Sequence, residues 1–336
     1  MKIYITDYPG VLNRDTDYEK NRILSALKDA EDGNSVITNT EVDVISYTDR
    51  EEWLKKVADA DALLTAFIPI DADIINKLPN LKCIVQNASG YENIDLETAT
   101  ERGIAVIPIE EYCTLEVAEH TFALILALAR GLKHYGQDID NNHKWQYSSI
   151  TNLHRLAGMK IGIAGYGKIG KQVGKLATAF GMEVLVYSPT GKNINTPDFP
   201  VNFVTKERLF QESDVITNHM AVGKDHYKFF NYEAFKAMEK HPIFINVGRG
   251  VAVDETALIR ALDEGLLSAA GLDVLESENP DLSTNPLVAR ENVIITPHSA
   301  FYSEESLKAL QDISCDNLTY YLKGETEKVH RIVNDV

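Results

Sequence analysis

The sequence predicts an α/β fold of two doubly wound domains, each built on a parallel sheet. Three observations support this prediction. Short apolar runs alternate with helix-like stretches along nearly the whole chain, which is typical of strands covered by helices on both faces. The alternating pattern occurs twice in succession. The length of 336 residues is too great for one simple core and suits two domains.

In the first half, the apolar runs are short, as expected of buried strands. Turns or predicted helices, such as 17–32, lie between them. A last helix is expected over 304–322, because Ser303 is a good N-cap and Glu304 and Glu305 suit the positive helix start. Since it follows the last strand, this helix could pack back on the first domain and make that domain discontinuous. The strands expected in the first half are 2–6, 42–47, 62–67, 83–88 and 104–109.

The second half repeats the pattern after a helix expected over 115–130. This helix begins polar and becomes apolar all round, and such a helix has to be buried on all sides. It could be buried inside one subunit or between two, and the residues alone favour burial inside one. The strands expected in the second half are 160–164, 183–187, 215–219, 243–247, 271–275 and 292–296.

Composition excludes several classes of function. The net charge is −17, from 33 basic and 50 acidic residues, and such a field repels nucleic acids and anionic lipid surfaces. The start of the chain lacks the pattern of a secretory signal, and the longest apolar run, 122–129, is shorter than the roughly 20 residues that span a bilayer. Three scattered cysteines argue against a disulfide framework or a zinc site. We therefore expect a cytoplasmic protein without a metal.

A glycine-rich loop points to a dinucleotide. The segment "GYGKIG" follows a clear strand and opens a clear helix. Gly165 would form the tight turn, Gly167 would admit the pyrophosphate, and Gly170 would let helix and strand pack closely. The phosphates would then meet the free N–H groups of the helix start. The alternative, a glycine turn without a ligand, is disfavoured by this context.

The end of the next strand bears on which dinucleotide is bound. An acid usually stands there, where it accepts hydrogen bonds from the adenosine ribose and repels a 2′-phosphate. Here the position holds Ser188, followed by Pro189, Thr190 and Lys192. The hydroxyl and the cation could hold a 2′-phosphate, or Lys192 could be a solvated loop residue in a site that takes NAD less tightly. We expect NAD or NADP, with a slight preference for NADP.

Four more polar residues lie in or just after predicted strands of the second half: Arg249, Asp273, Glu278 and His298. Ligands of open parallel sheets bind beyond the carboxyl ends of the strands, so these side chains would lie near a cofactor on the glycine loop. A histidine held by a carboxylate can donate a proton near neutral pH. An arginine can bind a carboxylate and polarise a keto group. This combination fits the reduction of a 2-keto acid.

The sequence resembles the D-isomer-specific 2-hydroxyacid dehydrogenase family over nearly its whole length. The matching motifs are "GYGKIG", "NVGRG", "LDVLESENP", "TPHSA" and "ASGYENID". The segment "EYCTLEVAEHT" is similar to the branch that includes relatives of C-terminal binding protein. The resemblance implies that Arg249, Glu278 and His298 are catalytic and that Asp273 lies on the cofactor side. It also implies that the N–H groups of Ser89 and Gly90 bind the substrate carboxylate.

The same resemblance implies a Rossmann-type cofactor domain, 106–299, and a flavodoxin-like substrate domain formed by 1–105 and 300–336, with a cleft that closes by hinge motion. It further implies a homodimer that uses the helix from Leu115. Phe67 and Tyr91 are expected to line the substrate pocket or to belong to the core. The expected cofactor contacts are Gly165, Tyr166, Gly167, Lys168, Ile169, Gly170, Ser188, Pro189, Thr190, Lys192, His219, Met220, Ala221, Val247, Gly248, Arg249, Asp273 and His298.

The chain departs from the family pattern at three positions. Ser188 replaces the usual aspartate, Ala221 replaces a proline, and Gly248 stands where alanine or serine is usual. The predicted function is NAD(P)-dependent interconversion of 2-keto acids and D-2-hydroxy acids. The alternative is a dinucleotide-sensing interaction protein similar to C-terminal binding protein. A formate- or phosphite-type dehydrogenase is disfavoured by the ordinary pair of Glu278 and His298.

Overall fold

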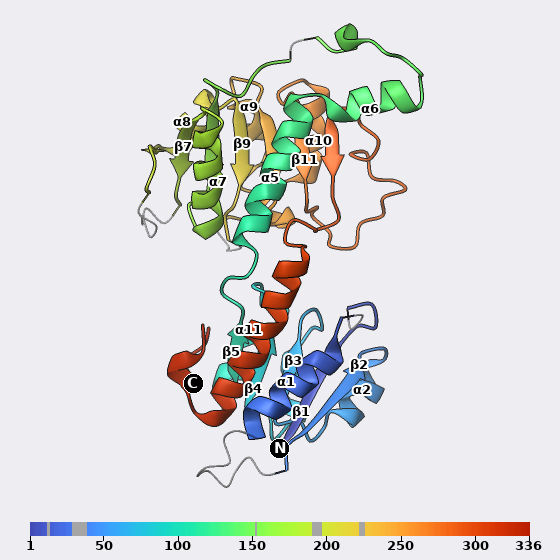
Figure 1. The fold of residues 1–336 in the computed structure, drawn as a ribbon, viewed down its shortest axis with the longest axis vertical. Coiled ribbons are helices and arrows are strands. Elements are labelled where there is room, and N and C mark those ends of the chain that lie inside the picture. Colours follow the sequence, from blue (N-terminus) through green and yellow to red (C-terminus); the bar gives the residue numbers. More distant parts are fainter. Residues whose placement is uncertain (12–13, 29–38, 152, 190–196, 222–225) are drawn as a thin grey trace. The chain divides into compact units, whose positions relative to one another are not determined.

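The computed structural model describes residues 1–11, 14–28, 39–151, 153–189, 197–221 and 226–336. The chain forms two compact units, each with its own parallel sheet (Figure 1). The first unit combines Met1–Tyr112 with Ser303–Val336, and the second is Cys113–Tyr302. The predicted fold class, two parallel-sheet α/β domains, is confirmed.

The sheet of the first unit has the strand order β2-β1-β3-β4-β5, and all neighbouring strands are parallel. Every residue of β3, β4 and β5 is buried, whereas the edge strand β2 is largely open to solvent. The strands are β1 (Lys2–Asp7), β2 (Glu41–Ser46), β3 (Ala62–Thr65), β4 (Cys83–Gln86) and β5 (Ala105–Pro108).

Short helices begin where aspartate side chains accept hydrogen bonds from the first turn. Asp49, Asp71 and Asp95 cap α2, α3 and α4 in this way, each at 2.9 Å. An N-cap of this kind stabilises a helix start by about 1 kcal/mol. The helices of the first unit are α1 (Thr16–Lys28), α2 (Arg50–Lys56), α3 (Ala72–Lys77), α4 (Leu96–Glu101) and α11 (Glu304–Lys323), followed by the 3₁₀ turn η4 (Thr326–Lys328).

Helix α11 contributes to the core of the first unit. It begins at Ser303 in a capping box and ends at Gly324, as the sequence predicted to within a few residues. Its Cys315 and Leu318 are fully buried in a cluster that includes β1 and β4. Arg22 of α1 binds Asp316 with two hydrogen bonds, at 2.8 and 3.0 Å. The last segment of the chain therefore covers one face of a sheet built by the first segment (Figure 1).

The sheet of the second unit has the order β12-β11-β10-β9-β6-β7-β8, again parallel throughout. The strand order reverses at β6, which pairs with β7 on one side and β9 on the other. Such a switch point leaves room for a ligand outside the carboxyl ends of the strands. The strands are β6 (Lys160–Ala164), β7 (Glu183–Tyr187), β8 (Asn202–Phe203), β9 (Val215–Asn218), β10 (Ile243–Asn246), β11 (Ala269–Leu272) and β12 (Val293–Ile295).

Helices cover both faces of this second sheet. Side chains of α5 and α7 form one core with it, and side chains of α8, α9 and α10 form the other. The helices are α5 (Thr114–Ala129), α6 (Leu132–Asp140), α7 (Lys168–Ala179), α8 (Lys206–Glu212), α9 (Tyr232–Lys236) and α10 (Glu255–Asp263), with 3₁₀ turns η1 (Tyr147–Ser149) and η3 (Gly250–Ala252). No helix in the described part of the chain has both the length and the apolar character needed to cross a bilayer.

Helix α5 differs from its sequence prediction. One face, with Val117, Phe122 and Ile125, is buried in the core of its own unit. The opposite face is open, and Leu115 is 57% exposed. The expectation that this helix is buried on all sides is therefore wrong for the single chain, because the sheet and α7 cover only one of its faces.

Candidate active site

The glycine loop between β6 and α7 contains two glycines that the fold itself requires. Gly165 has a φ of +97°, and a Cβ there would lie 2.7 Å from the backbone of His219 and Met220. A Cβ on Gly170 would lie 2.2 Å from the carbonyl oxygen of Gly165. These two glycines let the turn, the helix and the loop after β9 approach one another.

Gly167 is different, because protein packing does not explain it. A Cβ there would meet no protein atom within 4 Å, and the backbone is extended (φ −82°, ψ −164°). The residue is the N-cap of α7, so the open space lies at a helix start where N–H groups point outward. A side chain would fill the space that a pyrophosphate needs. The loop therefore fits a dinucleotide, and the backbone of Gly167, Lys168 and Ile169 would hold it.

The remaining predicted contacts of this loop divide into three groups. The ring of Tyr166 is 5% exposed and belongs to the core, with its edge against the more exposed Phe203, so a cofactor contact from Tyr166 would have to come from its backbone. Ser188 lies directly after Tyr187, whose carbonyl oxygen accepts a hydrogen bond from Gly165 N–H at 2.9 Å. Ser188 and the exposed Pro189 therefore border the glycine loop. Thr190 and Lys192 lie outside the described residues.

Two buried asparagines shape the loops that follow β9 and β10. The side-chain amide of Asn218 donates to Asn246 Oδ1 at 3.0 Å. Asn218 Oδ1 accepts from Met220 N–H, and Asn246 Oδ1 accepts from Gly248 N–H, at 3.1 and 3.2 Å. Asn246 also donates to the carbonyl oxygen of Arg249 at 3.2 Å. Sequence reasoning missed both residues; the available signal was an asparagine at the carboxyl end of a buried strand.

This amide pair accounts for one departure from the family pattern. A Cβ on Gly248 would lie 3.1 Å from both Asn218 O and Asn218 Nδ2, which is tighter than an alanine normally tolerates. Of the nearby predicted cofactor contacts, Met220 and Val247 are buried and Ala221 is exposed. His219 Nε2 lies 2.8 Å from Thr217 Oγ1. Burial lowers the pKa of His219 to about 3, so its ring is neutral at physiological pH.

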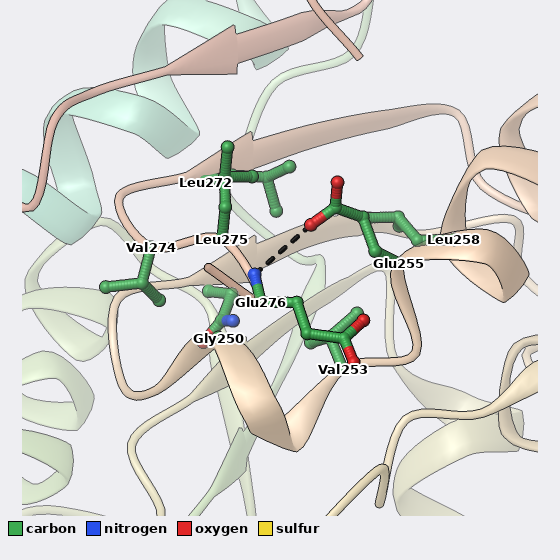
Figure 2. Close-up of a pocket in the computed structure, with 9 residues that line it drawn as sticks. Gly250, Val253, Glu255, Leu258, Leu272, Val274, Leu275 and Glu276 are labelled. Carbon is green, nitrogen blue, oxygen red and sulfur yellow. Dashed lines mark hydrogen bonds between the residues drawn. The ribbon is translucent and has the colours of Figure 1, made fainter. Parts of the chain in front are cut away.

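Arg249 lies in the turn after β10, where a close backbone approach fixes its place. A Cβ on Gly250 would lie 1.7 Å from the carbonyl oxygen of Leu275, so only glycine fits there. Figure 2 shows Gly250 against Leu275 and Glu276, at the start of the loop that carries Glu278. Arg249 itself is partly buried, and its NH1 donates to the carbonyl oxygen of Gly248 at 3.1 Å.

Glu278 and His298 form the predicted pair, with His298 Nδ1 2.8 Å from Glu278 Oε2. The hydrogen bond from His298, followed by the charges of His298 and Arg249, lowers the pKa of Glu278 below its usual range. The Glu278 and His298 side chains are 62% and 40% exposed, so they are open to a substrate. Because Nδ1 is directed to Glu278, Nε2 is the nitrogen left for proton exchange.

The backbone of His298 is left-handed, with a φ of +50°, which is uncommon for a residue with a Cβ. Asp273 holds this turn. Its carbonyl oxygen accepts from His298 N–H at 2.7 Å, and its carboxylate accepts from Ser299 N–H and Ala300 N–H at 2.9 and 3.0 Å. The carboxylate also accepts from Thr296 Oγ1 at 2.6 Å. Asp273 is 1% exposed, so it positions the histidine turn, and its contact with a cofactor stays a prediction.

His120 of α5 is a further neighbour that sequence reasoning missed. Its Nε2 lies 2.9 Å from Thr296 Oγ1 and 3.5 Å from Asp273 Oδ1. Since the Thr296 hydroxyl donates to Asp273, it has to accept from His120. The signal in the sequence was a histidine in the polar first half of this helix, between Glu119 and Thr121.

The predicted substrate residues belong to the first unit, beyond the ends of β3 and β4. Ser89 is exposed, and Gly90 is partly buried. Phe67 is 55% exposed, and its N–H donates to the carboxylate of the buried Asp7 at 3.1 Å. Burial raises the pKa of Asp7. Tyr91 packs on the core of this unit, with the Arg331 guanidinium 5.8 Å from its ring centre. The side chain of Phe67 is therefore exposed to solvent, and that of Tyr91 is partly buried against the core.

Comparison with known proteins agrees with this geometry. The family model for the NAD binding domain of D-isomer specific 2-hydroxyacid dehydrogenases matches residues 122–300. Hydroxypyruvate reductase of Blautia hydrogenotrophica is 36% identical over 292 residues, which cover 85% of this chain and 90% of that protein. Glyoxylate reductase of Korarchaeum cryptofilum is 34% identical over 276 residues, which cover 81% and 82%.

Among solved structures, D-lactate dehydrogenase of Aquifex aeolicus, complexed with NAD and lactic acid, matches with a TM-score of 0.84 and 28% identity over 99% of both chains. The fold, the glycine loop and the relatives thus agree. The chain belongs to the D-isomer-specific 2-hydroxyacid dehydrogenase family, as its motifs predicted, and is an oxidoreductase of 2-keto and 2-hydroxy acids that uses a nicotinamide dinucleotide.

Proposed function

We propose that the protein reduces small 2-keto acids to D-2-hydroxy acids, with Arg249, Glu278 and His298 as catalytic residues. The observation that carries these assignments is the 2.8 Å bond between His298 and Glu278 in an open site. The charge of Arg249 contributes to the lowered pKa of Glu278, which supports a cation near this pair. Because curated relatives are named hydroxypyruvate reductase and glyoxylate reductase, these two keto acids are the first substrates to test.

Each residue of the proposed site has a chemical task. Bound NADH or NADPH supplies the hydride. Arg249 binds the substrate carboxylate and polarises the keto group, and the N–H groups of Ser89 and Gly90 add hydrogen bonds to the carboxylate. His298 Nε2 donates the proton to the keto oxygen. The negative charge of Glu278 stabilises the charged imidazole and holds its orientation through Nδ1.

The test is oxidation of NADH and NADPH by the purified protein with pyruvate, glyoxylate, hydroxypyruvate, and branched and aromatic keto acids. We expect His298→Gln and Arg249→Gln to lose turnover by about 10²- to 10⁴-fold, while NADH binding measured by fluorescence stays within twofold. The exposed His154, replaced in His154→Gln, serves as the control. Normal turnover in His298→Gln would refute the assignment. Binding of NADH without turnover on any keto acid would favour dinucleotide sensing instead.

We also propose a preference for NADP over NAD. Ser188 supports it, because a serine beside the glycine loop cannot repel a 2′-phosphate as an aspartate does. We expect Ser188→Asp to lower the ratio of kcat/KM for NADPH to that for NADH by about tenfold or more. The neighbouring substitution Pro189→Ala is the control. An unchanged ratio in Ser188→Asp would contradict this account of cofactor choice.

The assignment of the two units is part of the proposal. The second unit, Cys113–Tyr302, would bind the dinucleotide, and the first unit would bind the substrate. We place the protein in a reducing cytoplasm, which suits a chain in which none of Cys83, Cys113 and Cys315 is in a disulfide.

We propose a homodimer on the basis of large exposed apolar side chains in α5 and in the segment between α5 and β6. Leu115, Leu132, Ile139, Trp145 and Tyr147 are all exposed, Trp145 by 91%. In Figure 1, the chain from α6 to η1 extends beyond the layers of the second unit. Several large exposed apolar groups in one part of the chain point to a protein interface.

Sedimentation tests the dimer. We expect the wild-type protein to sediment as a dimer and the double variant Trp145→Asp, Tyr147→Asp to sediment as a monomer, because a buried charge opposes association. The matched control is Tyr227→Asp, which changes a tyrosine that is 60% exposed elsewhere in the unit. A wild-type monomer at micromolar concentration would contradict the proposal.

A further inference from the structure

We propose that Glu255 is a positioning residue for the pair of Glu278 and His298, because it binds both ends of the loop that carries Glu278. The inference rests on the catalytic roles proposed above. Glu255 is the first residue of α10 and follows the N-cap Asp254. It does not belong to the proposed catalytic set, and the family motifs quoted above do not include it.

The carboxylate of Glu255 makes one hydrogen bond to each end of the loop. Oε2 accepts from the backbone N–H of Glu276 at 3.1 Å, as Figure 2 shows. Oε1 accepts from Asn285 Nδ2 at 2.8 Å. Hydrogen bonds to an ionised carboxylate are roughly twice as strong as neutral ones. One carboxylate thus links the two points at which the loop leaves and rejoins the unit.

Between these points most side chains of the loop are exposed, and Glu278 bonds His298. Leu275 before it and Leu287 after it are buried, but the side chains of 276–279 and 281–284 are exposed, and Leu282 is 53% exposed. Asp281 orders the middle of the loop from within, since it accepts hydrogen bonds from Ser283 and Thr284. A loop without buried apolar side chains takes its position from polar contacts at its ends. Glu278 lies within this segment, two residues after Glu276, whose N–H group donates to Glu255.

A second, weaker restraint acts on the same end of the loop. The ammonium group of Lys228 lies 3.5 Å from the Glu276 carboxylate and 3.6 Å from the Asp254 carboxylate. These groups are partly exposed, and such ion pairs contribute little. Glu255 lines a small pocket between α10 and β11, together with Val253, Leu258 and Leu272 (Figure 2). Unlike Lys228, it makes a hydrogen bond to each end of the loop.

Loss of the two hydrogen bonds made by Glu255 would let Glu278 move away from His298. We expect Glu255→Ala to lower kcat for keto-acid reduction by about tenfold, since misplacement of a catalytic group by an ångström costs this much or more. The acid limb of the pH–rate profile should move to higher pH, because Glu278 loses the hydrogen bond from His298 that lowers its pKa. NADH affinity should stay within twofold. Glu255→Gln keeps one accepting oxygen and should restore part of kcat.

A double-mutant cycle decides whether Glu255 acts through Glu278. In the wild-type background Glu255→Ala should lower kcat about tenfold, and in the Glu278→Gln background it should change kcat less than twofold. The matched control is Glu264→Ala, at the other end of α10. Glu264 also accepts two hydrogen bonds, from Tyr232 and Arg260 at 2.7 Å, but contacts neither end of the loop. It should leave kcat and the pH profile unchanged.

Three results would overturn the inference. Glu255→Ala could leave kcat and the pH profile unchanged, or it could lower kcat by the same factor in both backgrounds, which would indicate general destabilisation. If Glu278→Gln itself has no effect on kcat, then the proposed catalytic pair fails, and the inference fails with it. Should Glu255→Ala not fold, Asn285→Ala removes one of the two hydrogen bonds from the loop side and should produce the same changes to a smaller extent.

Discussion

At the residue scale, the site depends on side chains that other residues hold in place. His298 has a left-handed backbone that Asp273 stabilises. Arg249 follows Gly248, where the hydrogen-bonded pair of Asn218 and Asn246 leaves little room for a side chain. These supporting residues contact the reactive ones without having to touch a substrate. A catalytic group needs such support, since small displacements cost rate.

A residue-scale prediction concerns His219, whose pKa burial lowers to about 3. The unfolded chain binds a proton at this residue below about pH 6.5, whereas the folded protein stays neutral until about pH 3. Protonation therefore favours unfolding between these values, and stability is lost as the pH falls, by at most about 1.4 kcal/mol per pH unit. We expect the Tm of His219→Gln to decrease less than that of the wild type between pH 6.5 and 4. Calorimetry without cofactor measures this difference.

The control for this prediction is His154→Gln, which removes an exposed histidine. Its Tm should follow the wild-type curve over the same pH range. A His219→Gln curve as steep as that of the wild type would show that His219 does not carry the acid sensitivity.

At the element scale, the turn from β6 into α7 separates glycines needed for folding from one needed for binding. Gly165 and Gly170 avoid backbone contacts of 2.7 and 2.2 Å, whereas Gly167 faces open space at the helix start. The sequence pattern treats all three alike. Only the packed structure shows which of them a ligand requires.

Two alanine substitutions test this difference. Gly170→Ala should destabilise the protein by about 1–3 kcal/mol, because the backbone has to shift to admit the methyl group. Gly167→Ala should leave Tm within about 1 °C, since its Cβ meets no protein atom, and should weaken NADH binding at least tenfold by filling the phosphate site. Urea unfolding and fluorescence titration measure the two effects. Equal loss of stability in both variants would contradict the distinction.

At the scale of the whole molecule, the first unit is assembled from the two ends of the chain. Leu318 of α11 is fully buried against residues of β1, β3 and β4. The face of the sheet that α1 and α11 share therefore lacks part of its cover until α11 is in place. The whole second unit lies between these two segments in the sequence. The first unit therefore depends on contacts between residues that are distant in sequence.

Leu318→Ala should cost about 2–5 kcal/mol of stability. The loss should appear in hydrogen exchange of amides in β1, β3 and β4, far from the substitution in sequence, because those strands share its core. Leu282→Ala, at a leucine 53% exposed in the second unit, is the control and should change neither stability nor exchange. Faster exchange confined to 304–323 would contradict a shared core.

Much of this protein followed from local sequence. Strand-length apolar runs, the strand–glycine–helix order, and polar residues at strand ends predicted two parallel sheets and a dinucleotide site on the second, since each signal depends on neighbouring residues. The prediction for α11 succeeded for the same reason, because Ser303 and its acidic first turn are local features. The sequence also pointed to Glu278 and His298 as partners, through the order of their motifs.

Other features depended on the tertiary structure, because contacts across strands depend on strand order, which no short segment encodes. Only the folded chain brings His298 to 2.8 Å from Glu278, His120 to Thr296, and Glu255 to both ends of its loop. Asp273 is buried, so its carboxylate binds protein groups, and packing covers only one face of α5. The sequence by itself determined which elements and which chemistry the chain carries, whereas the fold decided which side chains meet, because proximity depends on the packing of distant segments.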